Sequence, residues 1–392
     1  MPSAKPPPQT DILISGGGMI GLTQALALAR AGFSVRLVER IEPEHALNPT
    51  FDGRASALAY TSCNLLEALG LWPDLAEHAE PIREIRVSDG DVPLFLHFDH
   101  EDVGDRPLGH MVENRHLRHV LLAAVRKADG VTIDAPHRIT ATECTMDGVT
   151  AELDNGTTVR ARLLVGAEGR TSPTREMAGI RCHEWRYGQD GIVTTVTHER
   201  PHRGIAHERF LPSGPFAILP LVGNRSSIVW TERRRLADAV MGLSDAGFDD
   251  ELGKRFGSFL GRVHATGPRW RYPLALQVAA RFVDRRVCLI GDSAHGIHPI
   301  AGQGANLGFK DVAALTEVLV DAARTGTDIG ADGVLARYQR WRRVDTVALS
   351  VVTDALNHLF SNDIAPVALA RDMGLGAVNR MAPLKKFFMN HA

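Results

Sequence analysis

The chain has 392 residues, of which 44% are hydrophobic and 23% charged, so it can bury a large core and form two or more cooperating modules. Lys plus Arg (44) nearly balances Asp plus Glu (46), and the net charge of -2 gives no reason to expect a nucleic-acid partner. The four cysteines form no C-x-x-C pair, which argues against a disulfide framework or a thiolate metal site and favours a reducing compartment.

A strand, a tight turn, a helix and a second strand are predicted at the start of the chain. Residues 11–15 are a short apolar run, three glycines follow, and residues 19–30 carry Ala and Leu at helical spacing before the β-rich residues 34–39. Two further apolar strands, at 163–166 and 287–290, also run into glycine-bearing turns with an acidic residue. We expect these strands to belong to one sheet.

The segments between them have a different character. Alternating patterns such as 192–196 and 226–230 favour strands, so residues 81–112 and 183–275 are predicted to form an interleaved second sheet. A long helix is expected from about Gln303, and the apolar spacing over 333–360 is also helical. The chain then divides into a first domain (1–80, 113–182 and 276–332), a second domain (81–112 and 183–275) and a C-terminal helical region (333–392).

The first motif with chemical meaning is Gly16-x-Gly18-x-x-Gly21, which follows a strand and opens a helix. Such glycines let the backbone approach a pyrophosphate at the positive end of the helix. Glu39, at the end of the next strand, has the offset expected of a carboxylate that accepts ribose hydroxyls. A tight turn without a ligand is the alternative, and the motif does not distinguish NAD from FAD.

The second motif extends over residues 288–311. Gly291-Asp292 follows a strand, where the carboxylate can hold a polyol chain. A glycine-rich turn from Pro299 to Asn306 then opens a long helix, whose N-terminus stabilises negative charge.

With this second motif the sequence resembles the class A flavoprotein aromatic hydroxylases, and among them the ubiquinone-biosynthesis hydroxylases of the UbiH/UbiF type. The residues that carry the resemblance lie along almost the whole chain: 52–55, 113–115, 166–175, 214–221 and 298–311. It implies an α/β fold with a Rossmann-like FAD-binding domain, as in p-hydroxybenzoate hydroxylase, a mixed β-sheet substrate domain and a helical C-terminal part.

The resemblance also implies site residues. The acid matching Asp292 binds the ribityl chain of FAD, the turn with Pro299 lies against the flavin ring, and its backbone is the one candidate for a catalytic role. Arg54 and Arg115 are expected to face the FAD. Motif and resemblance together indicate these cofactor-binding residues: Gly16, Gly18, Met19, Ile20, Gly21, Glu39, Arg40, Arg54, Arg115, Glu168, Gly169, Gly291, Asp292, Pro299, Gly302, Gln303, Gly304, Ala305 and Asn306.

Two residues depart from the family pattern. Glu168 stands where relatives usually have Asp, so the helix cap or the nicotinamide contact is expected to shift by one methylene. His207 stands where relatives more often have an aromatic ring, and we assign it with Phe216 and Leu219 to the substrate pocket. The three His-x-x-His pairs lack a third ligand of suitable spacing, and no metal site is expected.

The implied activity uses NADH or NADPH to reduce FAD, and dioxygen to form a flavin hydroperoxide that oxygenates an aromatic ring. The expected substrate is a prenylated phenol that is a precursor of ubiquinone, delivered from a membrane or a quinone-biosynthesis complex. The start of the chain lacks the apolar stretch of a secretory signal, so we expect a cytoplasmic protein with peripheral membrane contact. The tail 383–389, which is basic and apolar, either touches that membrane or packs as a terminal helix.

Two alternatives stay open at this point. A hydroxylase of a small soluble aromatic acid or phenol would need an Arg or His to grip a carboxylate, and His207 is a candidate for that role. A flavin-bound accessory protein without turnover is the other alternative.

Overall fold

The computed structural model describes residues 10–48, 50–90, 95–102, 104–297 and 302–360. Pro299 and the tail 383–389 lie outside these residues. None of the helices in the described ranges is long and apolar enough to cross a lipid bilayer.

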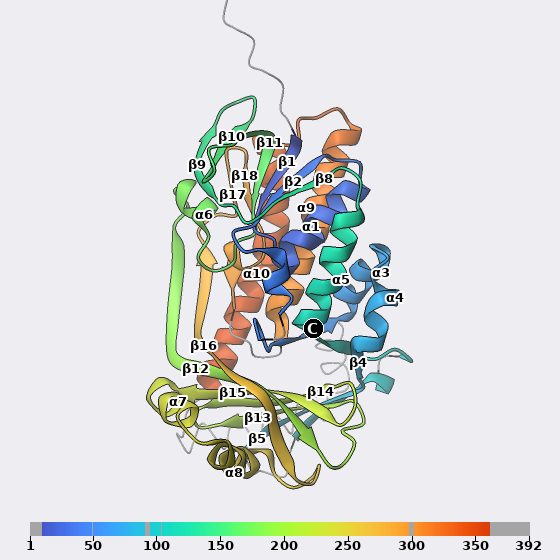
Figure 1. Ribbon diagram of the computed structural model, residues 1–392, viewed down its shortest axis with the longest axis vertical. Coiled ribbons are helices and arrows are strands. Elements are labelled where there is room, and N and C mark those ends of the chain that lie inside the picture. The colour runs from blue at the N-terminus through green and yellow to red at the C-terminus, as the bar shows by residue number, and fades with distance from the viewer. Residues whose placement is uncertain (1–9, 49, 91–94, 103, 298–301, 361–392) are drawn as a thin grey trace, which may run out of the picture.

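The upper part of the molecule in Figure 1 is built on an eight-stranded sheet whose centre is parallel. Its strands, in spatial order, are β17 (Val283–Asp284), β18 (Val287–Leu289), β11 (Thr158–Gly166), β1 (Thr10–Ser15), β2 (Val35–Val38) and β8 (Val131–Asp134), with β10 (Val149–Leu153) pairing with β11 and β9 (Ile139–Cys144) pairing with β10. The strands predicted at 11–15, 163–166 and 287–290 are therefore neighbours in one sheet, which confirms that expectation. Parallel strands place their carboxyl ends at one edge, so the turns that follow them converge.

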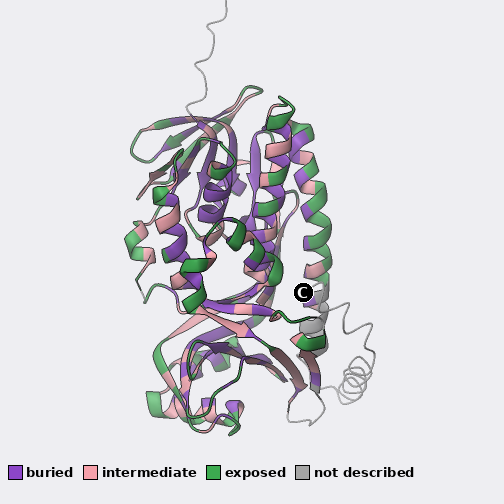
Figure 2. Cartoon of the chain, turned by 90° about the vertical axis from the view of Figure 1, so that its right-hand side faces the viewer, coloured by how far each residue is buried: buried purple, intermediate pink, exposed green. Residues whose placement is uncertain are grey.

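Helices α1 (Met19–Arg30), α5 (Asn114–Lys127) and α9 (Gln303–Arg324) pack against this sheet, and α10 (Asp332–Phe360) packs along α9. In Figure 2 the strands between them are almost entirely buried. The core holds fully buried side chains of β1, such as Ile12 and Ile14, together with Leu26 of α1 and Leu315 of α9. The helices predicted from the apolar spacing at 19–30, from Gln303 and at 333–360 are confirmed.

A second eight-stranded sheet forms the lower part of the molecule. Its strands, in spatial order, are β19 (His295–Gly296), β16 (Val263–Ala279), β12 (Cys182–His198), β15 (Arg225–Arg233), β14 (Gly214–Leu221), β13 (Ile205–Leu211), β5 (Glu84–Asp89) and β6 (Phe95–Asp99). Helices α7 (Arg234–Met241) and α8 (Asp245–Phe256) cover one face, where Phe216, Trp230 and Phe248 form a separate buried cluster. Apart from β19, its strands come from residues 84–99 and 182–279, and they include the alternating patterns at 192–196 and 226–230.

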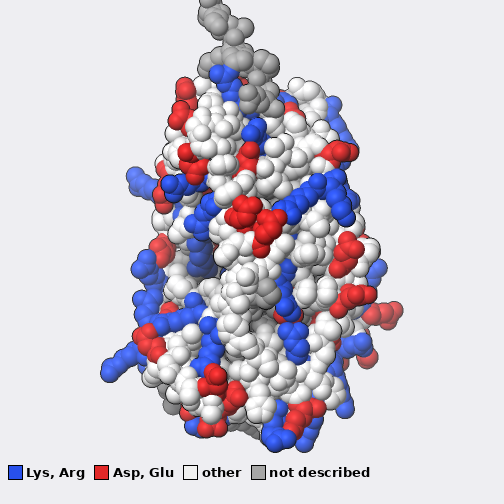
Figure 3. Space-filling view, viewed as in Figure 1, with Lys and Arg blue, Asp and Glu red and all other residues white. Residues whose placement is uncertain are grey.

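The remaining elements are short and connect the two sheets. They are a three-stranded sheet of β3 (Ala55–Ala59), β7 (Gly109–Glu113) and β4 (Ala79–Ile82), helices α2 (Pro43–Ala46), α3 (Tyr60–Ala68), α4 (Trp72–Leu75) and α6 (Pro173–Met177), and the 3-10 turns η1 (Ala76–His78), η2 (His100–Asp102) and η3 (Gly291–Ser293). The exact division of the chain into six domain segments stays a prediction. Basic and acidic side chains are interspersed over the face seen in Figure 3, in keeping with their nearly equal numbers.

Candidate functional site

One large cavity lies between the two sheets. Its volume is about 2190 Å³, whereas pockets for a single drug-sized molecule are roughly 300–1,000 Å³. The glycine turns at the carboxyl edge of the first sheet line one part of it, and strands of the second sheet line the other. The cavity is therefore large enough for a dinucleotide cofactor together with a substrate.

The first glycine motif shapes the turn between β1 and α1. Gly16 has a φ of 106°, and a Cβ there would lie 2.5 Å from the carbonyl oxygen of Ala167. A Cβ on Gly21 would lie 1.9 Å from the carbonyl oxygen of Gly16, so this glycine lets the helix approach its own turn. Gly21 itself does not line the cavity, whereas Gly16, Gly18, Met19 and Ile20 do.

The N-terminus of α1 is open toward the cavity. Gly18 is its N-cap, no side chain among the described residues caps it, and no acidic residue lies in its first turn. A Cβ built on Gly18 would meet nothing within 4 Å. Free N–H groups and the helix dipole therefore face a space that an anion can enter.

Glu39 follows β2 and lines the same part of the cavity, as does Arg40. Its two carboxylate oxygens accept hydrogen bonds from the backbone N–H groups of Gly17 (2.5 Å) and Ile41 (2.9 Å). Each oxygen keeps a second lone pair, so Glu39 can hold the glycine turn and still accept a ribose hydroxyl. Its contact with a ribose stays a prediction.

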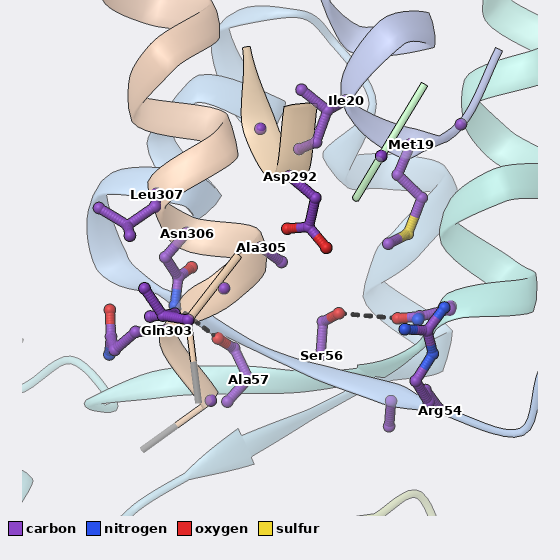
Figure 4. A pocket seen from close by; sticks show the side chains of 18 of the residues that line it. Met19, Ile20, Arg54, Ser56, Ala57, Asp292, Gln303, Ala305, Asn306 and Leu307 are labelled. Atoms are coloured by element: carbon purple, nitrogen blue, oxygen red, sulfur yellow. Dashed lines mark hydrogen bonds between the residues drawn. The ribbon is translucent and has the colours of Figure 1, made fainter. Parts of the chain in front are cut away.

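The second motif places another open helix end at this cavity. Gly302 is the N-cap of α9, no described side chain caps it, and Gln303, Gly304 and Ala305 all line the cavity. Figure 4 shows the Asp292 side chain pointing into the space beside this helix start. The Asp292 carboxylate lies 3.6 Å from the Arg170 guanidinium and stays partly exposed to the cavity.

Asn306 has a structural task that the motif did not reveal. Its amide donates to the carbonyl oxygen of Ala57 (2.9 Å) and accepts from the N–H of Ala59 (3.0 Å) and the hydroxyl of Ser62 (2.8 Å). Asn306 therefore ties the start of α9 to β3 and α3, and Figure 4 shows its bond to Ala57.

Arg54 faces the cavity from the side opposite α9 (Figure 4). Its guanidinium donates to both oxygens of Asp52, at 2.9 and 3.1 Å, and lies 4.8 Å from the ring centre of Tyr272. Burial alone would raise the pKa of Asp52, but Arg54 and Arg118 outweigh it and hold that pKa well below its usual value. Asp52 thus orients two cationic side chains at the cavity wall.

Two of the residues predicted to bind the cofactor, Arg115 and Glu168, are held by other side chains of the protein. Arg115 is not among the cavity-lining residues and pairs with Glu113 at 3.2 Å, whereas Arg118, one turn further along α5, does line the cavity. Glu168 lines the cavity but caps α6, because it accepts hydrogen bonds from Ser172 (2.5 Å) and from the N–H (3.2 Å) and hydroxyl (2.5 Å) of Thr174. Gly169 donates its N–H to Ser293 (3.1 Å), which joins the turn after β11 to η3.

The prediction that Phe216 lines the substrate pocket is wrong. Its ring is fully buried on the other face of β14, against Trp230 with ring centroids 6.0 Å apart. Side chains alternate along a strand, so its neighbours Pro215, Ala217 and Leu219 line the cavity instead. Leu219 thus lines the cavity, and its contact with a substrate stays a prediction.

His207 lies at the cavity margin, with its ring 4.6 Å from that of Phe259. Burial, together with Arg86 and Arg209, lowers the pKa of His207 to about 4. The imidazole is therefore neutral near pH 7.

Sequence reasoning missed four side chains that shape the site: Asp52, Arg118, Asp311 and Glu208. Asp52 and Asp311 stand within motifs that were recognised, but each has a partner on another element, Arg118 and Arg342 respectively. The alternating pattern of 205–211 could have placed Glu208 on a strand, though not on the cavity face. That choice depends on the packing of the other face against α7 and α8.

Comparison with known proteins identifies relatives for nearly the whole chain. Residues 9–352 match the family described as FAD binding domain. The chain is 53% identical to "Ubiquinone hydroxylase UbiL" of Rhodospirillum rubrum over 97% of this chain and 89% of that protein. It is 36% identical to "3-demethoxyubiquinol 3-hydroxylase" of Escherichia coli over 98% of both chains.

Solved structures agree on the fold. The p-nitrophenol 4-monooxygenase of Pseudomonas putida superimposes with a TM-score of 0.82 at 22% identity, over 98% of this chain and 97% of that chain.

Proposed function

The chain belongs to the FAD-binding domain family that includes the ubiquinone-biosynthesis hydroxylases, and on that premise we propose that it oxygenates the aromatic ring of a prenylated ubiquinone precursor. The observation that carries the proposal is the large cavity between the two sheets. Two helix N-termini, those of α1 and α9, line one end of this cavity, and an apolar face of the second sheet lines the other end.

The residues of the cavity fit FAD. The open N-terminus of α1 suits the diphosphate, Glu39 suits the adenosine ribose, and Asp292 suits the ribityl hydroxyls. Two guanidinium nitrogens of Arg118, Nε and Nη2, are buried without a hydrogen-bond partner among the described residues. A buried guanidinium needs acceptors, and an anionic cofactor beside it supplies them.

When bound, FAD supplies the redox chemistry, taking electrons from NADH or NADPH and using them with dioxygen. The protein's own residues bind and orient the cofactor and the substrate. The N-terminus of α9 faces the cavity, and the helix dipole stabilises negative charge placed there. Arg54, held by Asp52, adds a fixed cation on the other side of the cavity.

The second sheet provides an apolar wall for the ring and the tail of the substrate. Val87, Ala217, Val229 and Leu274 are among the side chains on this wall. They keep water away from the reacting atoms and suit a prenylated phenol better than a charged one.

These observations disfavour a small aromatic acid as the substrate. A neutral His207 offers no positive charge for a carboxylate, and the acidic side chain of Glu208 lines the same wall. We therefore keep the prenylated phenol as the substrate class.

A prenylated substrate requires delivery from lipid, and we propose that α10 makes a peripheral contact with a membrane surface. Trp341, Val344, Val347 and Val351 recur at intervals of three or four residues along α10, with 42 to 70% of each side chain exposed. Exposed Arg340 and Arg343 accompany them. Aromatic and aliphatic side chains next to basic ones are typical of helices that lie in the membrane interface.

The activity is tested with purified protein supplied with FAD, NADH or NADPH, and a prenylated phenol. We expect oxidation of the nicotinamide that the phenol stimulates, and a product heavier by one oxygen atom derived from labelled dioxygen. Deletion of the gene should make a quinone precursor accumulate. If no prenylated phenol is oxygenated and the deletion strain keeps normal quinone, the proposed substrate is wrong. If the phenol does not stimulate nicotinamide oxidation at all, the protein is a flavin-bound accessory protein.

A further inference from the structure

A single carboxyl group interrupts the apolar wall of the cavity. Glu208 lies in β13, between β5 and β14, and is in register with Val87 on one side and Ala217 on the other. The same row continues through Val229 of β15 to Val193 of β12. All of these side chains line the cavity, so Glu208 is the one ionisable member of an otherwise apolar row.

Glu208 has no partner among the described residues. Among the residues that the structure describes, none donates a hydrogen bond to its carboxyl group or forms an ion pair with it, although the side chain is half-buried. Burial among apolar groups raises its pKa to about 7, and no charged neighbour offsets this effect. Such a placement costs free energy of folding, and no structural contact of the side chain explains it.

Two other polar side chains near this wall, Tyr272 and His207, are less suited to meet a substrate. The hydroxyl of Tyr272 donates to Asp52 at 3.4 Å, and the ring of His207 packs against Phe259. Two charged residues lie close to Glu208, Arg86 in β5 and Arg209 in β13. Both occupy positions between the cavity-facing ones, so their side chains belong to the other face of the sheet. Arg209 donates to the carbonyl oxygen of Arg255 in α8, on the far face of the sheet.

We propose that the Glu208 carboxylate accepts a hydrogen bond from a ring hydroxyl of the aromatic substrate and so orients the ring and raises its electron density. The inference rests on the proposed function, because it requires a phenol in this cavity. The hydroxyl donates and the carboxylate oxygen accepts. Electron density gained by the hydroxyl oxygen is shared with the ortho and para carbons of the ring, the positions that an electrophilic oxygen attacks.

This role has a pH signature. Only the ionised carboxylate is a full acceptor, so kcat/KM for hydroxylation should rise as pH increases through about 7 and then level off. In the complex the substrate hydroxyl stabilises the ionised form, and the corresponding rise in kcat should move to lower pH. A residue with a merely structural role would produce neither effect.

The variants Glu208→Gln and Glu208→Leu test the proposal in the holoenzyme. We expect kcat for hydroxylation to fall by about 100-fold or more in both, with loss of the rise near pH 7. The FAD content of both variants should stay at the wild-type value. Glu152→Gln, at an exposed position of strand β10, is the matched control and should leave all of these readouts unchanged. A wild-type rate and pH profile in Glu208→Gln and Glu208→Leu would overturn the proposal.

A binding measurement separates this proposal from the proposed function. The probes are a short-chain prenylphenol and its methyl ether, which lacks the hydroxyl donor. The wild-type holoenzyme should bind the phenol at least 10-fold more tightly than the ether, and Glu208→Leu should bind the two equally. If the wild type shows this preference without hydroxylating the phenol, the proposed function fails and the role of Glu208 stands. Equal binding of phenol and ether by the wild type rejects that role even if hydroxylation occurs.

Discussion

At the scale of single residues, the glycines of the first turn have two distinct tasks. Gly16 and Gly21 allow the backbone to pack closely, because a Cβ at either position would collide with backbone atoms. Gly18 has no such restriction, since its φ of -69° suits any residue and the space around its Cβ is open. Its lack of a side chain therefore matters for a ligand and not for the fold.

We predict that Gly18→Ala weakens FAD binding about 10-fold or more, because the added methyl group occupies the space that the diphosphate needs. The flavin-free protein should lose no more than about 1 kcal/mol of unfolding free energy. Titration with FAD and thermal melts of the flavin-free protein measure the two effects. Gly253→Ala, in α8 and also with open space around its Cβ, is the control and should leave FAD affinity unchanged. Unaltered FAD binding in Gly18→Ala would count against the diphosphate assignment.

At the scale of elements, Asp311 joins α9, α10 and η3. Its fully buried carboxylate accepts hydrogen bonds from the N–H of Gly291 (2.9 Å), from His295 (2.6 Å) and from Arg342 (2.7 Å). Burial alone would raise the pKa of Asp311, but His295 and Arg342 outweigh it and lower that pKa. The turn that carries Asp292 is thus fixed by a side chain 19 positions further along the chain.

Asp311→Asn is expected to destabilise the protein by about 3–5 kcal/mol, because it removes the buried counter-charge of the Arg342 guanidinium, which then keeps only the half-exposed Asp345 as an ionic partner. The depressed pKa means that the ionised Asp311 stabilises the fold above about pH 4 and that this contribution is lost as pH falls further. The variant should therefore also show a flatter loss of stability on acidification. Denaturant unfolding at several pH values measures both effects. Arg337→Ala, which breaks an exposed pair between the same two helices, should cost no more than about 1 kcal/mol. Equal costs for the two variants would contradict this account.

At the scale of the whole molecule, the reaction site exists only because two sheets face one another. The first sheet presents the glycine turns, the second presents the apolar wall, and the long strands β12 and β16 run between the two parts (Figure 1). Four residues of α10, Asp345, Ala348, Leu349 and Thr353, also line the cavity, on the same helix that carries the exposed stripe 341–351. A membrane docked on that stripe would therefore lie close to the site.

We predict that the holoenzyme floats with vesicles of phosphatidylethanolamine and phosphatidylglycerol, because Trp341 and the three valines bury apolar surface in the interface. Replacement of Trp341, Val344 and Val351 by Ser should reduce the floating fraction several-fold. Leu236→Ser, at an exposed apolar position in α7, is the control and should float like the wild type. Flotation of the triple variant at the wild-type level would show that α10 is not the contact.

Periodicity and glycine spacing predicted much of this protein because they are local. The order β1, glycine turn, α1, β2 follows from apolar spacing and turn residues within thirty positions, and the long helices α9 and α10 follow from theirs. The rotation of a helix about its own axis is not predicted by these local signals. Arg115 was expected to face the cofactor, but the packing of α5 brings Arg118 to the cavity instead, and no local signal contains that rotation.

The sequence alone therefore determined the chemistry that the chain can host: a dinucleotide turn, a second glycine turn before a long helix, and two kinds of sheet. The tertiary structure decided which side chains meet in the cavity. It turned Ala217 inward and Phe216 outward, and it brought Asp52 to Arg118 and Asp311 to Arg342. It also left Glu208 on an apolar wall with no partner in the part of the chain that the structure describes. The physical reason is that turns and periodicities depend on neighbours in the chain, whereas burial, ion pairing and the choice of a strand's inner face depend on separate elements that come together only in the folded protein.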